Sequence, residues 1–181
     1  MKKIILMIII CLVSCKEEKS LKLEELDKFE KEEVIVKDED VFKVVLSIKI
    51  KENDRLDLFY TGEFPDDEFN EYERLGKDVK GSNEFQIIEF NLPEGVLPYK
   101  FRIDLGKNSN RHQTQVDIEW INLEFNDNKI NIKNLVLKSF FHPNIYLEQN
   151  DDGYLRKTVA DKFDPFIVSK PVLNKKIELE L

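Results

Sequence analysis

From position 41 onward, apolar and polar residues alternate in short runs, which is the period of a β-strand with one buried face. Turn-forming residues at 52–54 end the first run, and the alternation resumes with Leu56, Leu58 and Tyr60. We therefore expect the first two strands to form a hairpin. The first run places these apolar side chains on a single face: Phe42, Val44, Leu46, Ile48 and Ile50.

Further strands are expected along the rest of the chain, separated by turn residues. Only the acidic stretch 65–73 could form a short helix. Short antiparallel strands with a turn about every ten residues are typical of an all-β sandwich. We therefore predict a single antiparallel β-sandwich, jelly-roll-like in topology, over residues 41–181, without an internal repeat. The expected strands cover residues 85–92, 99–105, 114–125, 129–138 and 175–181.

Two of these segments change phase once, which is the pattern that a β-bulge produces. In the segment 114–125 the extra residue is expected at Trp120 and Ile121, and a similar shift falls between Ile87 and Ile88. Bulges bend strands as a curved sheet requires, although misplaced strand ends would give the same pattern. Trp120 lies within the apolar pattern, which favours packing in the core over a binding platform.

The N-terminus has the layout of a secretory signal: Lys2 and Lys3, an apolar run over 4–13, and then Ser14 before Cys15. The run is too short to span a bilayer as a mature helix. Residues 12–15, LVSC, resemble a lipobox, the bacterial lipoprotein signal that is cut before a lipidated cysteine. The resemblance implies lipidation of Cys15 and attachment to a membrane through the N-terminal lipid. An ordinary signal peptide with an incidental cysteine is the alternative.

Residues 1–14 are thus expected to be removed, and residues 15–40 to form the lipidated cysteine and a charged tether. Of the 25 residues after the cysteine, 17 are charged with mixed signs, which favours a solvated spacer. Lys16, Glu17 and Glu18 resemble the export signal of Bacteroidetes-type surface lipoproteins. The resemblance implies an outer-membrane lipoprotein that faces the cell surface, with a periplasm-facing one as the alternative.

The composition excludes several classes of function. The chain of 181 residues has 28 basic and 36 acidic side chains, a net charge of −8. Loss of the signal peptide removes two lysines and leaves −10, with Cys15 as the only cysteine. No disulfide, cysteine-ligated metal or thiol nucleophile is then possible. The basic residues are outnumbered and interleaved with acids, so nucleic acid is not an expected partner.

The motifs of common catalytic sites are missing from the sequence. The two histidines, His112 and His142, form no HExxH motif, and none of the six glycines falls in a phosphate-binding loop. We therefore expect a non-enzymatic protein with no catalytic residues, no metal centre and no cofactor. Polar stretches at 126–128 and 150–153 could offer oxygens to a structural calcium ion, but they lack the spaced ligands of an EF-hand. Turn chemistry is the simpler interpretation.

Two stretches of the body resemble a known class of domain. Residues 81–86 read GSNEFQ, and residues 101–106 read FRIDLG before a polar loop and a strand of I-x-x-I character. This pattern resembles galactose-binding-like, carbohydrate-binding jelly rolls attached to bacterial envelope proteins. The resemblance covers roughly residues 79–125 and implies a lectin-like module without catalysis. It includes no sugar-contacting motif.

Sugar recognition needs exposed aromatic rings and a few planar polar groups. Tyr72 and Tyr154 lie in predicted loops beside acidic and amide groups, and Arg111 and His112 lie in a polar loop between two strands. We expect these four residues to form a ligand-binding rim at one end of the sandwich. The leading hypothesis is a lipoprotein that binds glycan or another envelope ligand. The alternative is a protein-interaction lipoprotein, either an accessory subunit of an envelope complex or an inhibitor or immunity factor.

Overall fold

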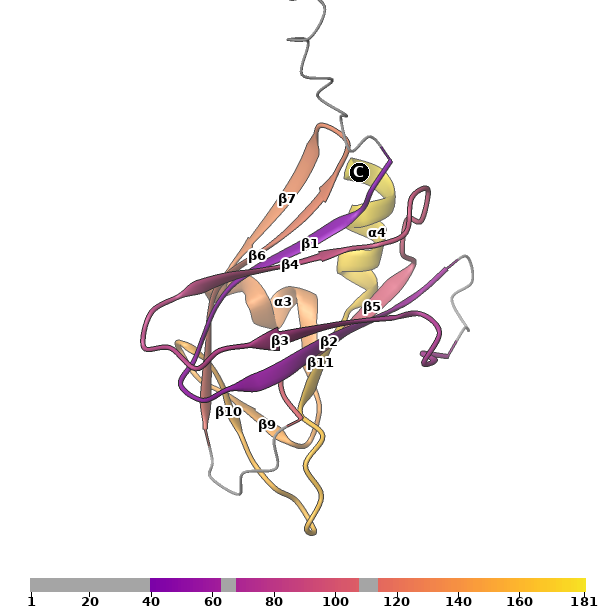
Figure 1. The fold of residues 1–181 in the computed structure, drawn as a ribbon. Coiled ribbons are helices and arrows are strands. Elements are labelled where there is room, and N and C mark those ends of the chain that lie inside the picture. The colour runs from indigo at the N-terminus through magenta and orange to yellow at the C-terminus, as the bar shows by residue number, and fades with distance from the viewer. Residues whose placement is uncertain (1–39, 63–67, 108–113) are drawn as a thin grey trace, which may run out of the picture. The chain divides into compact units, whose positions relative to one another are not determined.

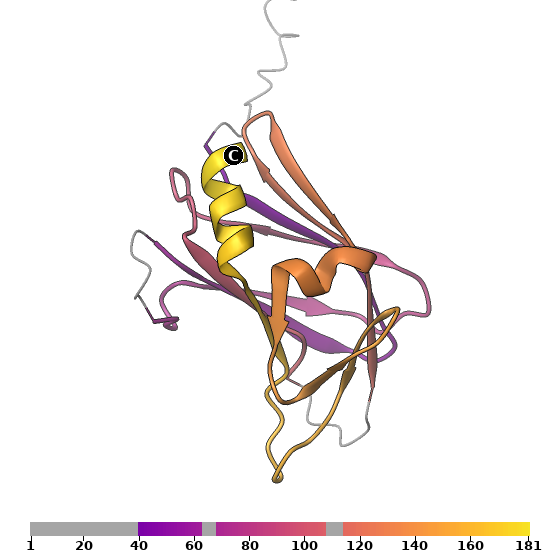
Figure 2. The same ribbon diagram turned by 180° about the vertical axis from the view of Figure 1, so that it is seen from behind.

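Two antiparallel sheets pack face to face in the computed structural model, which describes residues 40–62, 68–107 and 114–181 (Figures 1 and 2). The predicted all-β sandwich is thereby confirmed. The expected signal peptide, Cys15 and the export signal lie outside the described residues. Within the described ranges, no helix is long and apolar enough to cross a membrane.

The first sheet, sheet A, has the strand order β4-β1-β6-β10-β9. The far side of β6 is shared, because β10 pairs with its beginning and β7 with its end. The strands of sheet A are β1 (Lys43–Ile50), β4 (Gln86–Asn91), β6 (Gln115–Phe125), β7 (Asn128–Lys133), β9 (Leu147–Gln149) and β10 (Gly153–Arg156).

The second sheet, sheet B, has the strand order β3-β2-β5-β11-β8. All of its neighbouring strands are antiparallel. The strands of sheet B are β2 (Asp54–Thr61), β3 (Arg74–Val79), β5 (Lys100–Asp104), β8 (Phe141–Pro143) and β11 (Phe166–Ser169).

The core fills the space between the two sheets. All five apolar residues that alternate along 42–50 are fully buried, so the predicted inward face of β1 is confirmed. The inward rings of Phe101 and Phe141 meet edge to face, 5.7 Å apart. Since these rings come from β5 and β8, the core joins segments that are distant in the sequence.

Helical segments lie at one side of the sandwich, between the sheets (Figure 2). They are η1 (Asn134–Val136), α3 (Leu137–Phe140) and α4 (Pro171–Glu180). The strand expected over 175–181 is therefore wrong. Pro171 begins a helix, and Leu173 and Ile177, four residues apart, bury their side chains in the core. The helix allowed over 65–73 is also wrong for its described part, 68–73, which is a loop and turn before β3.

The expected hairpin between the first two strands is wrong. β1 pairs with β4 and β6, whereas β2 pairs with β3 and β5. Residues 51–53 carry the chain across from sheet A to sheet B. Alternation specifies that each strand has one buried face, and two such faces can meet across a core as well as lie side by side in one sheet.

The bulge expected in β6 is confirmed, one residue earlier than predicted. Ser47 of β1 faces Trp120, and the next residue, Ile48, faces Ile118, so Glu119 is the extra residue. Ser47 points away from the core, because Leu46 and Ile48 on either side of it are buried inward. Trp120 opposite Ser47 is therefore on the outer face of sheet A, and the expected core position of this ring is wrong.

The second expected bulge, between Ile87 and Ile88, is wrong. The pairing of β4 with β1 runs without a break from Asn91 to Gln86. Ile88 packs against the core, whereas Ile87 is 58% exposed and lies on the outer face with Phe85, which is 45% exposed. The apparent phase shift thus came from apolar residues on the outer face.

Candidate ligand-binding face

The structure places the predicted site residues in different environments. Tyr72 is 98% exposed in the turn before β3, where the Asn70 side-chain oxygen accepts its backbone N–H at 2.9 Å. Arg111 and His112 lie outside the described residues. Tyr154 is in β10, where it pairs with Val116 of β6.

The expected position of Tyr154 in an exposed loop is wrong. The residue is completely buried, and burial raises the pKa of its hydroxyl to about 12. The polar stretch 150–153 ends just before Tyr154, so the sequence predicted that the loop continues through this residue. Because no face of the ring is open, Tyr154 cannot stack against a sugar in this structure.

Replacement of Tyr154 by phenylalanine is expected to leave the free energy of unfolding unchanged or to raise it by up to about 1 kcal/mol. The change removes a buried hydroxyl that has no hydrogen-bond partner among the described residues. In the native chain the unfolded tyrosine ionises near pH 10 and the folded one near pH 12, so this residue lowers stability as the pH rises through that window. Urea unfolding of both proteins at pH 7 and pH 11 measures both effects. A loss above about 1 kcal/mol at pH 7 would show that the hydroxyl has a partner.

The expected rim does not assemble from the described residues. Tyr72 precedes β3, whose first residue, Arg74, pairs with Phe59 near the end of β2. Lys107, the last described residue before the gap at 108–113, donates its backbone N–H to Asp54 at the start of β2. Phe59 and Asp54 are five residues apart in β2, which separates these two positions by roughly 17 Å.

The outer face of sheet A carries an aromatic and apolar cluster that the sequence analysis missed. One row across the strands consists of Ile87, Ser47, Trp120 and Lys133, on β4, β1, β6 and β7. Ile87 is exposed and Trp120 is partly buried, and Phe85, two residues before Ile87, is also exposed. We use the name Trp120 face for the outer surface formed by this row together with Phe85. Its sequence signal was the phase break in β6, which moves the indole from the core to the surface.

Planar polar groups lie beside the indole in the next row. Asn131 of β7 donates its side-chain amide to the Asn122 oxygen of β6 at 2.5 Å, and Asn122 is 5% exposed. On the β1 side of the indole, the Ser47 hydroxyl donates to Glu119 at 2.7 Å. The side chains around Trp120 are thus fixed by hydrogen bonds to neighbouring strands, so this part of the face is preorganised.

One charged pair borders the Trp120 face at the far end of β1. The Lys49 ammonium lies 2.6 Å from Asp117 of β6 and 5.1 Å from the centre of the Phe85 ring. The hydrogen bond to Asp117 raises the pKa of Lys49. The lysine therefore stays charged at neutral pH and covers part of one ring.

The outer face of sheet B has a different character, because cations cover its rings. The Arg102 guanidinium lies 5.1 Å from the Phe59 ring and 3.8 Å from the Phe166 ring. It also contacts Asp104 at 2.5 Å and Asp164 at 3.2 Å. Burial raises the pKa of Asp104, and its hydrogen bond with Arg102 opposes that shift. The arginine therefore occupies the surface on which a sugar would stack.

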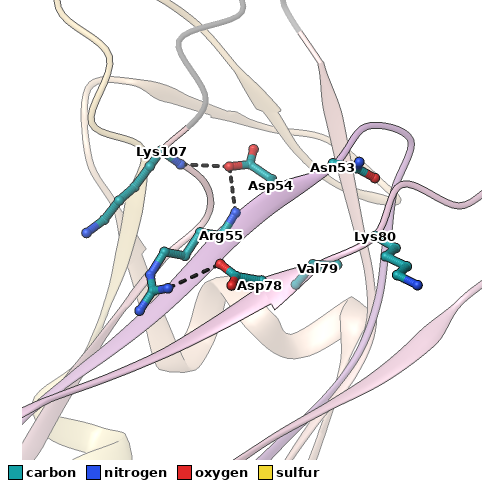
Figure 3. Close-up of a pocket in the computed structure, with 7 residues that line it drawn as sticks. All are labelled: Asn53, Asp54, Arg55, Asp78, Val79, Lys80 and Lys107. Carbon is teal, nitrogen blue, oxygen red and sulfur yellow. Dashed lines mark hydrogen bonds and ion pairs between the residues drawn. The ribbon is translucent and has the colours of Figure 1, made fainter.

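A pocket of about 450 Å³ opens beside the start of β2, at the edge of sheet B (Figure 3). Its charged groups are largely engaged with one another. Arg55 contacts Asp78 at 3.1 Å, and one Asp54 oxygen accepts the backbone N–H groups of Arg55 and Lys107 at 2.8 and 2.9 Å. The lining residues are Asn53, Asp54, Arg55, Asp78, Val79, Lys80 and Lys107.

A buried ion pair links the two sheets behind this pocket. Arg156 of β10 is 2% exposed, and its guanidinium lies 2.6 Å from the second oxygen of Asp54. It also donates to the Leu105 carbonyl at 2.8 Å and to the Thr114 hydroxyl. These contacts join sheet A to sheet B, so this cluster serves the fold. The FRIDLG stretch contributes to it through Leu105 and its neighbour Gly106.

The oxygen-rich turns bind backbone groups of the protein. The Asn150 side-chain oxygen accepts the N–H groups of Asp152 and Gly153 at 3.1 and 2.9 Å, and the Asn126 oxygen accepts that of Asp40 at 2.8 Å. Among residues 40–62, 68–107 and 114–181, no three His, Cys, Asp or Glu side chains cluster as metal ligands. The turns therefore have a structural use for these oxygens.

The fold and the site together define a two-sheet antiparallel β-sandwich with an aromatic and amide cluster on the outside of one sheet. Comparison of the chain with protein-family models, with curated proteins and with solved structures found no match.

Proposed function

We propose that this protein is a non-enzymatic outer-membrane lipoprotein whose β-sandwich binds glycan through the Trp120 face. The observation that carries the proposal is the outward position of Trp120 beside the Asn122–Asn131 amide pair. An indole stacks on the apolar face of a sugar ring, and amides can exchange hydrogen bonds with its hydroxyls. Because strands carry all of these groups, binding costs little ordering of the protein.

A lipid anchor at Cys15 is consistent with the position of this face. The first described residue, Asp40, lies at one end of the sandwich, where its carbonyl accepts the Gly95 N–H at 2.8 Å. The 25-residue tether would reach about 80 Å if fully extended. Such a tether would be long enough to hold the sandwich away from the membrane surface. We propose display on the cell surface, with a periplasm-facing anchor as the alternative.

The non-enzymatic part of this proposal is supported by the contacts of two carboxylates on neighbouring strands. Asp57 and Asp104 face each other across β2 and β5. Asp57 contacts Arg55 at 3.1 Å and Lys107 at 2.5 Å, and Asp104 contacts Arg102. The cations of the protein therefore occupy the positions from which these carboxylates would meet a substrate.

Replacement of Trp120 by alanine is expected to weaken glycan binding at least about tenfold, or ~1.4 kcal/mol, because it removes the stacking surface. The full chain in detergent would be screened on an array of host and bacterial envelope glycans, with calcium and with EDTA. The selected glycan would then be titrated against each variant.

Tyr72→Ala is the matched control, since it also removes an aromatic side chain, but one that lies in the turn before β3 and not on the Trp120 face. Binding that is lost with Tyr72→Ala and kept with Trp120→Ala would move the site to the turn before β3. Binding that both variants keep would place it elsewhere.

A protein partner is the second candidate, and the exposed side chain of Ile87 favours it. Ile87 is 58% exposed, and together with Phe85 it extends the apolar cluster to the edge strand β4. An aliphatic side chain adds little to sugar stacking but much to a protein interface. A blank array followed by a cross-linked partner on intact cells, lost with Ile87→Asp, would support an accessory subunit or an inhibitor or immunity factor.

A further inference from the structure

A cavity of about 500 Å³ lies against α4, away from the Trp120 face. One wall comes from the loop that leads into β5, and the other comes from a single face of the helix, since its residues are spaced at i, i+3 and i+4. The lining residues are Gly62, Leu97, Pro98, Tyr99, Asn174, Ile177 and Glu178.

The walls of this cavity are mainly apolar. Leu97 and Tyr99 are 39% and 38% exposed, and Ile177 is buried at the helix side. Pro98 lies between the first two in the chain. A ligand that enters here must therefore present an apolar stem or ring to most of the surface.

Asn174 in the cavity wall carries a hydrogen-bond acceptor that lacks a donor among the described residues. The Asn174 side-chain oxygen is buried and has no hydrogen-bond partner among the described residues. A buried acceptor without a donor is unfavourable, so a ligand with an N–H or O–H group would gain a hydrogen bond once the Asn174 side chain turns toward the cavity.

The helix end beside the cavity is electronegative. Glu178 lies near the end of α4, where the helix dipole is negative and the last turn holds no basic residue. The Glu178 carboxylate contacts Lys175 at 2.8 Å, and both side chains are more than half exposed. Such a surface pair is weak, so a cation in the cavity could replace the lysine.

We infer that this cavity binds a primary ammonium group on an unbranched apolar stem, from either a lysine side chain or a free alkylamine. An ammonium group is a donor with no acceptor, which suits Asn174 and Glu178 together. The stem lies against Leu97 and Ile177, and the Tyr99 ring attracts the charge. A carboxylate would be repelled by Glu178. The inference does not depend on glycan binding, because it concerns another part of the molecule.

Chemical-shift titration of the ¹⁵N-labelled full chain in detergent tests this site. The probes are Nα-acetyl-lysine methylamide and butylamine, and the uncharged and acidic controls are Nα-acetyl-norleucine methylamide and butyrate. With an amine we expect saturable shifts of the Asn174 side-chain amide and the Tyr99 backbone amide. The controls are expected to bind at least about tenfold more weakly than the amines. Preference for the lysine probe points to a protein partner, and preference for butylamine to a free amine.

Charge variants give the second readout, because they leave the core intact. Glu178→Gln should weaken amine binding about tenfold, and Lys175→Gln should strengthen it by removing the competing cation. Trp120→Ala, the variant of the other face, should leave it unchanged. Equal binding of butyrate and butylamine, no shifts at all, or an amine affinity that is insensitive to Glu178→Gln would overturn the inference.

Discussion

Replacement of Arg156 by methionine is expected to lower the free energy of unfolding by about 3–5 kcal/mol, because it removes the guanidinium from a buried ion pair. Arg156 and Asp54 are both nearly inaccessible and lie 2.6 Å apart. After the change, Asp54 keeps the backbone N–H groups of Arg55 and Lys107 but loses the Arg156 guanidinium. The Leu105 carbonyl also loses its donor. Methionine restores most of the volume, so the loss reports on charge more than on packing.

Urea unfolding at pH 7 measures this loss. Lys157→Met is the matched control, since Lys157 is a neighbour in the chain whose contact with Glu148 is at 4.0 Å and exposed. It should change stability by less than about 0.5 kcal/mol. The double variant Asp54→Leu and Arg156→Met should recover part of the loss, because it removes both charges. A loss of less than about 1 kcal/mol for Arg156→Met alone would contradict the buried pair.

Local patterns in the sequence were enough to predict the sandwich. The strict alternation over 42–50 specifies one buried face, and the structure buries all five apolar residues there. Polar stretches marked most strand ends, but the strand expected over 129–138 ends at Lys133 and is followed by η1 and α3. Such features depend on neighbours in the chain, so a single sequence reveals them.

The pairing of strands was harder to predict, because it depends on contacts between distant residues. Nothing in residues 41–61 distinguishes a hairpin from a crossing between sheets. The ending IELEL alternates like a strand, yet it belongs to α4. Burial of Leu173 and Ile177 in the core outweighs the local pattern there.

The candidate site was only partly visible for the same reason. The phase break in β6 signalled a bulge, but the position of the extra residue decides on which face Trp120 lies, and pairing with Ser47 sets that position. The link between Asp54 and Arg156 spans 102 residues, and no spacing in the sequence points to it. The polar stretch at 150–153 made Tyr154 look exposed, whereas β10 buries it.

Replacement of Gly153 by alanine is expected to lower the free energy of unfolding by about 2–4 kcal/mol, through backbone strain and overpacking together. Gly153 has a φ of 155° and faces Asp117 of β6 in the strand pairing. A Cβ atom here would clash with the Val116 carbonyl oxygen and lie 3.0 Å from the Asp117 Cα. These are backbone atoms, so relief requires β10 to move away from β6.

Gly95→Ala is the control that separates strain from collision. Gly95 also has a positive φ, 75°, but a Cβ atom there would meet nothing within 4 Å. It should therefore cost about 1 kcal/mol through conformation alone. Urea unfolding of both variants gives their losses in the free energy of unfolding. The difference between the two losses measures how closely β10 packs on β6. Equal losses would mean that the strands lie further apart than this structure has them, and that the glycine at the start of β10 serves the turn before it more than the sheet.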